Sequence, residues 1–178
     1  MIIVRTERPE DIEGIREVNK RAFGQPQEAD IVDTLRGACP DALSFVAIEG
    51  DRVVGHILFS PATIHSGDDE VRGMGLAPMA VVPDEQRRGI GSKLVRTGLD
   101  VLKESSCPFV IVLGHPEYYP RFGFVPASHY DLHCQWDGVP DEAFMVIVLD
   151  ESAMEGVSGV ARYRSEFDAA MKEPDVQR

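Results

Sequence analysis

Hydrophobic residues along this chain recur with two different periods, one typical of strands and the other of helices. Short apolar runs rich in β-branched residues and bounded by turn residues predict strands. These runs cover residues 2–5, a hairpin at 43–64 that turns at "EGDR", 74–83, 109–113, 131–136, 144–149 and, more weakly, 157–163. Apolar positions spaced three and four apart predict helices over 11–23, 28–36, 91–105 and 165–172, with a short helix inside 116–124.

The order of these elements predicts one α+β domain built on a mixed sheet. The polar stretch "HSGDDEVRG" (65–73) is expected to form a loop, and the strands at 131–136 and 144–149 are expected to pair with each other. Residues 1–150 would form the domain. Residues 151–178 would be a C-terminal extension that packs on this domain or is swapped from it.

Composition narrows the class of protein. The chain has 178 residues, of which 43% are hydrophobic and 27% charged, as in an ordinary globular domain. No apolar run approaches the roughly 18 residues of a membrane span, and the N-terminus lacks the features of a signal peptide. Three widely spaced cysteines without a C-x-x-C motif favour a reducing cytoplasm over a disulfide framework. We therefore expect a cytoplasmic protein with no membrane partner.

The formal net charge of −12 argues against a general nucleic-acid surface and favours cationic partners weakly. One segment, Glu85 to Lys103, departs from this balance because its basic residues outnumber its acidic ones. The basic residues there are Arg87, Arg88, Lys93, Arg96 and Lys103.

Inside this basic segment, the stretch "QRRGIG" (86–91) lies between a predicted strand and a predicted helix. It is not a P-loop, because Lys93 follows the serine and no glycine lies four residues upstream. It is not a dinucleotide fingerprint, because Leu94 occupies the third glycine position. A glycine turn that opens a helix still presents backbone N–H groups and a partial positive charge to a diphosphate.

The motif "QRRGIG" after a strand ending in "VVP" resembles motif A of the GCN5-related N-acetyltransferases (GNAT fold). The segment "LGHPEYYPRFGF" (113–124) is similar to one in the YhbS-like predicted acetyltransferases of this family, and the order of elements over 2–149 also matches. The resemblance implies a mostly antiparallel sheet, flanked by helices and splayed between its fourth and fifth strands. It also implies acetyl-CoA as co-substrate and no metal.

The resemblance further implies which residues bind acetyl-CoA. The loop and the start of the helix would hold the pyrophosphate, and the exposed edge of "MAVV" would pair with the pantetheine arm. One N–H at Ala80 or Val81 would polarise the thioester carbonyl. The cofactor-binding residues implied are Met79, Ala80, Val81, Gln86, Arg87, Arg88, Gly89, Ile90, Gly91 and Ser92.

For the chemistry, the resemblance implies direct attack by a neutral primary amine and a tyrosine that protonates the departing thiolate. Tyr119 stands four residues before the glycine of "YPRFG", as the family's usual acid does, and Tyr118 is the alternative. The general base is less evident. His115 and Glu117 are candidates, and water is a third route for the proton.

Other readings stay open at this point. Cys107 and Cys134 would permit a covalent mechanism, but neither adjoins a motif. His129, His133 and Cys134 would permit a metal site, but there is no second cluster with ligand spacing. The missing base favours a non-catalytic acyl-CoA-binding or regulatory module as the rival function, and a transferase of longer acyl chains is a second rival. The acceptor would be a small-molecule or peptide amine. The tail over 151–178 could support a homodimer.

Overall fold

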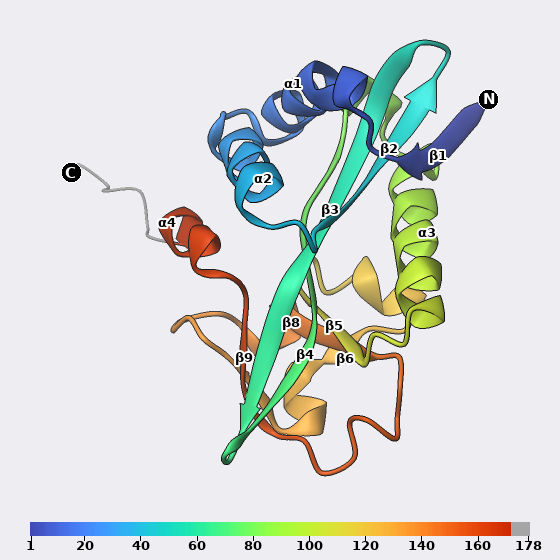
Figure 1. Ribbon diagram of the computed structural model, residues 1–178. Coiled ribbons are helices and arrows are strands. Elements are labelled where there is room, and N and C mark those ends of the chain that lie inside the picture. Colours follow the sequence, from blue (N-terminus) through green and yellow to red (C-terminus); the bar gives the residue numbers. More distant parts are fainter. Residues whose placement is uncertain (172–178) are drawn as a thin grey trace.

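Residues 1–171, which the computed structural model describes, form a nine-stranded mixed sheet with helices on both faces (Figure 1). The strands are β1 (Ile2–Thr6), β2 (Leu43–Glu49), β3 (Arg52–Ser66), β4 (Asp69–Val81), β5 (Phe109–Leu113), β6 (Val125–Pro126), β7 (Leu132–Cys134), β8 (Phe144–Val148) and β9 (Gly159–Arg162). The α-helices are α1 (Ile12–Phe23), α2 (Gln27–Ala38), α3 (Ile90–Glu104) and α4 (Asp168–Met171). Short 3-10 helices are η1 (Pro9–Asp11), η2 (Pro83–Glu85), η3 (Tyr119–Phe122), η4 (Ala127–Tyr130), η5 (Asp141–Ala143) and η6 (Ser165–Phe167).

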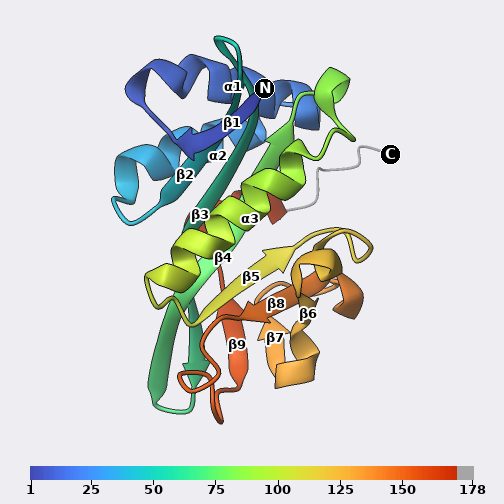
Figure 2. The same ribbon diagram turned by 90° about the vertical axis from the view of Figure 1, so that its right-hand side faces the viewer.

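The main path through the sheet runs β1-β2-β3-β4-β5-β8-β6, and β9 joins it by pairing with β3. Helices α1 and α2 lie on one face, and α3 crosses the other face diagonally (Figure 2). Most pairs are antiparallel, but β4 and β5 run parallel because α3 connects them as a crossover. These features confirm the α+β class and the mixed sheet expected from the sequence.

The prediction of a loop over 65–73 was wrong. Strands β3 and β4 continue through this stretch, and the chain turns only at Gly67, where φ is +62°, and Asp68. Cross-strand pairs extend to Ser66 and Asp69 at the tip. The stretch looks like a loop in the sequence because the tip of the hairpin is exposed and so carries polar side chains.

The expected pairing of 131–136 with 144–149 was also wrong. Strand β8 pairs with β5 and β6, whereas β7 runs parallel to β9. The weak strand predicted near 157–163 is confirmed as β9. The helix predicted over 165–172 is shorter, with η6 followed by α4, and residue 172 lies outside the described residues.

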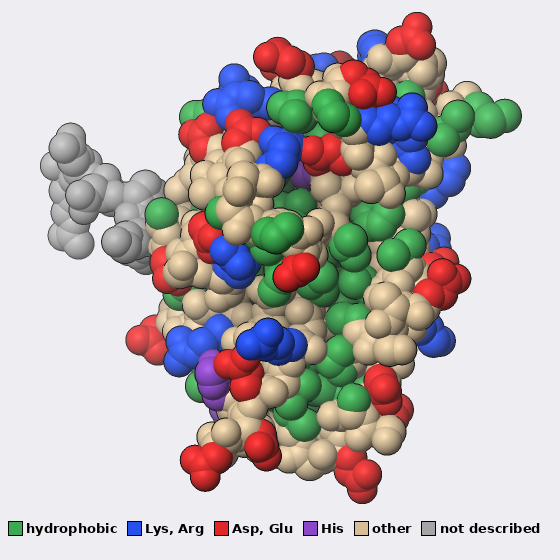
Figure 3. Space-filling view, viewed as in Figure 1, with side chains coloured by type: hydrophobic (Ala, Val, Ile, Leu, Met, Phe, Trp, Pro, Cys, Tyr) green, Lys and Arg blue, Asp and Glu red, His purple; other side chains and the backbone are tan. Residues whose placement is uncertain are grey.

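Each face of the sheet carries its own apolar core. On one face, α3 packs against β3 so closely that a Cβ on Gly98 would lie 2.2 Å from the ring of Phe59. On the other face, Ile15, Val32 and Leu35 of α1 and α2 pack over Leu58 and Ile64. On the surface shown in Figure 3, acidic and basic side chains are interspersed, and hydrophobic side chains gather along a strip down its middle.

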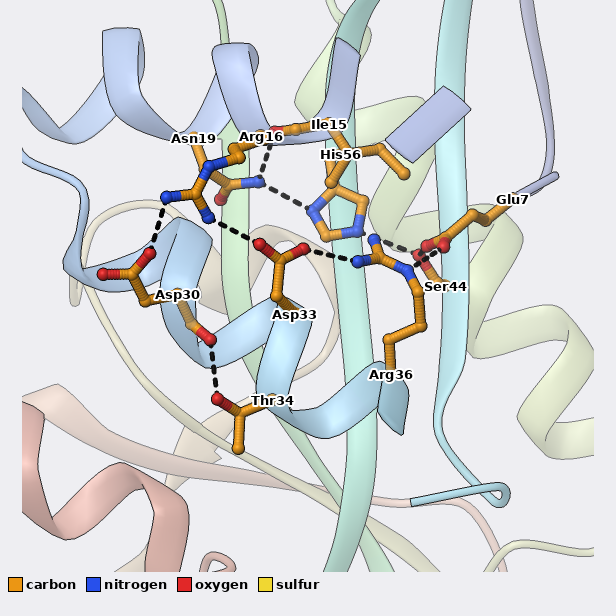
Figure 4. Close-up of polar contacts among 10 residues, drawn as sticks. All are labelled: Glu7, Ile15, Arg16, Asn19, Asp30, Asp33, Thr34, Arg36, Ser44 and His56. Atoms are coloured by element: carbon orange, nitrogen blue, oxygen red, sulfur yellow. Dashed lines mark hydrogen bonds and ion pairs between the residues drawn. The ribbon is translucent and has the colours of Figure 1, made fainter. Parts of the chain in front are cut away.

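A chain of hydrogen bonds ties the α1–α2 layer to the sheet through His56, a fully buried residue of β3 (Figure 4). The Asn19 side-chain amide donates to Ile15 O and, at 3.1 Å, lies against His56 Nδ1. His56 Nε2 lies 2.9 Å from Ser44 Oγ, whose hydroxyl donates to Glu7. Since Nδ1 accepts and Nε2 donates, the network requires a neutral imidazole.

Arginines extend this network across the two helices. Arg36 contacts Glu7 at 2.5 Å and Asp33 at 2.6 Å, and Arg16 of α1 contacts Asp33 at 2.5 Å and Asp30 at 2.7 Å (Figure 4). The cationic Arg36 is also close enough to disfavour a second positive charge on His56. The imidazole therefore has two physical reasons to stay neutral, burial first and Arg36 second.

We expect His56 to make the stability of the fold depend on pH between about 5 and 7. Burial lowers the pKa of His56 to about 3, from the usual value near 6.5. The unfolded chain therefore binds a proton in this range that the folded chain does not. The free energy of unfolding should fall as the pH drops below about 6.5, by up to roughly 1.4 kcal/mol per pH unit from this group. Thermal unfolding of wild type and His56→Gln from pH 7.5 to 5 measures how much His56 contributes to the pH dependence of stability.

His56→Gln should be less stable at neutral pH and should lose part of the pH slope. His133→Gln, which replaces an exposed histidine on β7, is the matched control and should keep the wild-type slope. An unchanged slope in His56→Gln would contradict the assignment to His56.

Candidate functional site

The site is organised by the separation of two neighbouring strands. Strands β4 and β5 pair at Met74–Leu76 with Val110–Val112, and β4 then continues to Val81 with β3 as its partner. At the point of separation Ala77 and Pro78 lie opposite the single residue Leu58, which is a β-bulge. Because bulges bend a strand, the predicted splay between the fourth and fifth strands forms here.

Beyond the bulge, alternation along β4 decides which backbone groups face the splay. The N–H of Val82 donates to Val54 O of β3 at 3.0 Å, so Val82 and Ala80 direct their backbone groups toward β3. Neighbouring residues of a strand direct these groups to opposite edges. The N–H groups of Met79 and Val81 therefore face away from β3, on the open side of β4.

The loop after β4 leads into α3, and no side chain of the described residues caps the N-terminus of this helix. Gly89 adopts the left-handed conformation with φ of +78°, and the first helical bond runs from Lys93 N to Gly89 O at 3.0 Å. The preceding amides of Ile90, Gly91 and Ser92 thus have no intrahelical acceptor. The Gln86 side chain donates back to Val81 O at 3.1 Å, which fixes the loop against the open edge of β4.

Two basic residues of the loop region point elsewhere. Arg88 forms ion pairs with Glu49, at 2.9 Å, and with Glu85, and it does not line the cleft in the described part of the chain. Lys93 donates to Ile2 O at 2.6 Å. Arg87, whose φ is +63°, does line the cleft. Of these three basic residues, it is therefore the one whose side chain is available beside the N-terminus of α3.

These features meet in a cleft of about 1130 Å³. Its floor is the splay, and its walls come from the glycine loop, the turn after β5, the end of α1, the start of α2, Trp136 and the C-terminal segment. Of the predicted site residues, the cleft is lined by Met79, Ala80, Val81, Gln86, Arg87, Gly89, Ile90, Gly91, Ser92, His115, Glu117, Tyr118 and Tyr119.

The two tyrosines of "PEYYPRFGF" differ in placement. Tyr119 is 6% exposed, packs edge-on against Phe124, and burial raises its pKa above the usual value near 10. Tyr118 is half-buried, and its hydroxyl lies beside α3, since a Cβ on Gly91 would be 2.7 Å from that oxygen. The guanidinium of Arg121 stacks over the Tyr118 ring at 4.7 Å.

The remaining candidates are less enclosed. His115 and Glu117 are exposed where the turn after β5 meets the cleft. Cys107 and Cys134 do not line the cleft within residues 1–171, and burial raises the pKa of both thiols, which disfavours a thiolate nucleophile. In the same part of the chain, no three His, Cys, Asp or Glu side chains gather as metal ligands, and no helix is long and apolar enough to cross a bilayer.

Part of the cleft is walled by residues that the sequence analysis did not assign. The side chains there are mostly apolar, and the half-buried Glu28 is an acidic member. The wall consists of Phe23, Glu28, Ile31, Trp136, Tyr163, Phe167 and Met171. They were missed because they come from helices and a C-terminal segment that carry no recognisable motif and meet only in the fold.

Comparison with known proteins gives a consistent result. The family model of the acetyltransferase (GNAT) domain matches residues 4–127. The chain is 36% identical over 168 residues to the N-acetyltransferase YhbS of Escherichia coli K12, covering 94% of this chain and 99% of that protein. It is 46% identical over 121 residues to the N-acetyltransferase YjhQ of the same organism, covering 66% of each.

Solved structures agree. The crystal structure of the Escherichia coli GNAT family N-acetyltransferase YhbS in complex with CoA matches with a TM-score of 0.87 and 36% identity, over 94% of this chain and 92% of that one. A GNAT family acetyltransferase from Brucella melitensis in complex with acetyl-CoA matches with a TM-score of 0.76 and 35% identity, over 94% and 99% of the two chains.

Proposed function

Because this chain belongs to the GNAT family of N-acetyltransferases, we propose that it transfers the acetyl group of acetyl-CoA directly to a primary amine. Family membership confirms the resemblance drawn from "QRRGIG" and "PEYYPRFGF". The observation that supports the proposal most is that the N-terminus of α3, whose first amides have no intrahelical acceptor, and the open edge of β4 line one cleft.

The glycine loop would bind the pyrophosphate of acetyl-CoA. The amides of Ile90, Gly91 and Ser92 lack intrahelical acceptors, and the helix N-terminus favours negative charge. Arg87 would add a cationic side chain to these amides. Arg88, whose guanidinium is engaged by Glu49 and Glu85, would contribute through its backbone.

The open edge of β4 would bind the pantetheine arm and the thioester. Met79 and Val81 have amides on the open side, whereas Ala80 directs its amide toward β3. Of the two residues considered for the oxyanion, this alternation favours Val81. A preorganised amide at this place typically contributes about 3–4 kcal/mol of transition-state stabilisation.

In the reaction, the amine nitrogen attacks the thioester carbon, the C–N bond forms and the C–S bond breaks. The thiolate then takes a proton, and we assign this proton to Tyr119. Its raised pKa keeps the phenol protonated over the working pH range. Tyr118, the alternative acid, lies against Gly91, which fits contact with the phosphates better. The proton of the amine would leave to His115, to Glu117 or to water.

The acceptor would be a small-molecule or peptide amine that enters along the part of the cleft walled by Phe23 and Trp136. The apolar wall there favours an acceptor with an apolar body, and Glu28 would attract the ammonium form before it loses its proton. The rival function, a non-catalytic acyl-CoA-binding module, predicts binding without turnover on any amine. The second rival, a transferase of longer acyl chains, predicts higher kcat/KM with those donors.

We expect acetyl-CoA to bind wild type and to bind Gly91→Ala about tenfold more weakly. The added methyl group would lie 2.7 Å from the Tyr118 hydroxyl and would cover the amides at the start of α3. Gly37→Ala is the matched control, since a Cβ at this exposed helical position meets no atom of residues 1–171 within 4 Å. Isothermal titration calorimetry measures all three dissociation constants. Absence of binding to wild type at millimolar acetyl-CoA would reject the proposed function.

We expect Tyr119→Phe to lower kcat by about a hundredfold, the usual lower limit for loss of a general acid, with little change in the acetyl-CoA dissociation constant. Tyr118→Phe should instead weaken acetyl-CoA binding and lower kcat less. Release of free thiol over a panel of aromatic, aliphatic and peptide amines measures turnover. If Tyr119→Phe retains the wild-type kcat on every amine that is acetylated, Tyr119 is not the acid.

A further inference from the structure

The C-terminal segment places one side chain at the point where β4 and β5 separate. The amide of Leu113 donates to the Tyr163 hydroxyl oxygen at 3.3 Å. The same hydroxyl donates toward Leu76 O, at 3.0 Å, and lies 3.3 Å from Ile111 O. Leu76 belongs to the last register pair, Leu76 with Val112, and Ile111 and Leu113 flank Val112 in β5. One hydroxyl therefore bridges both strands at the end of their pairing.

The surrounding residues hold this side chain in one position. A Cβ on Gly75 would lie 2.5 Å from the Tyr163 ring, so the ring can pack against the sheet here because residue 75 has no side chain. On its other side the ring stacks on Trp136 with centroids 5.7 Å apart, and Phe167 packs at 5.2 Å. The backbone N–H of Tyr163 donates to Gln135 Oε1 at 2.5 Å.

An apolar side chain would fill the same space, so packing alone does not require the hydroxyl. Burying a phenol without partners would cost stability, and here the partners are backbone groups of two strands that are about to part. The ring also lines the cleft. The hydroxyl therefore holds the backbones of β4 and β5 together next to the region that would bind the thioester.

We propose that the Tyr163 hydroxyl is a positioning group that fixes where β4 and β5 separate, and so sets the orientation of the open edge at Ala77–Val81. This inference rests on the proposed function, in which that edge binds the thioester arm of acetyl-CoA. Tyr163 does not touch the reacting atoms. It acts through Leu76, which directly precedes the bulge, and through Leu113 at the end of β5.

The test compares Tyr163→Phe with wild type in the full chain. Tyr130→Phe is the matched control, because this tyrosine lies outside the cleft within the described residues. We expect Tyr163→Phe to bind acetyl-CoA about fivefold more weakly, as for one lost hydrogen bond. Its kcat should fall about tenfold, because a misplaced edge misaligns the thioester, while the KM for the acceptor stays unchanged. A role in stability alone would lower the melting temperature and leave kcat unchanged.

Amide hydrogen exchange without ligand separates this inference from the proposed function. In Tyr163→Phe the amides of Leu113, Ala77 and residues 79–81 should exchange faster, whereas those of β1 and β2 keep their rates. If wild type does not bind acetyl-CoA, the proposed function fails, and an unchanged exchange rate at Leu113 in Tyr163→Phe then overturns the positioning role of the Tyr163 hydroxyl as well. If wild type binds and turns over, an unchanged kcat in Tyr163→Phe overturns the inference. Should Tyr163→Phe not fold, Gly75→Ala, which displaces the ring, replaces it under the same criteria.

Discussion

The architecture depends on one constraint, which is that a β-strand leaving its neighbour must still satisfy its backbone donors and acceptors. From Ala77 to Val81, β4 has β3 on one side and, within residues 1–171, no strand on the other. This edge would be a liability in most sheets. Here it lies at the floor of a cleft beside the N-terminus of α3, so the unpaired groups of a strand and of a helix face the same space.

Holding such an edge in place requires rigid surroundings, and both ends of the chain supply them. The buried network around His56 anchors α1 and α2 to β3, directly behind the open part of β4, since His56 pairs with Ala80. On the other side, β9 adds to β3 and delivers Tyr163 to the base of the splay. Segments more than a hundred residues apart therefore define one geometry.

Local sequence patterns predicted much of the fold and those lining residues of the cleft that lie around the glycine loop and in the turn after β5. The strand before "QRRGIG", the glycine turn and the amphipathic α3 are contiguous, so their period and spacing are visible in the sequence. The extension of β3 and β4 through 65–73 was missed because exposed hairpin residues are as polar as a loop. The β7–β9 pairing, the engagement of Arg88 by Glu49 and the role of Tyr163 were missed because each joins distant segments, and no local signal specifies such contacts.

The stacking of Trp136 on Tyr163 has an optical consequence. Trp136 is the chain's sole tryptophan, and it lines the cleft with its indole N–H donating to Asp168 at 2.9 Å. The intrinsic emission of the protein therefore originates at one wall of the splay. Any molecule that binds there, or any shift of the aromatic pair, changes the surroundings of the only strong fluorophore. The protein therefore contains an intrinsic fluorescent reporter at the point where β4 and β5 separate.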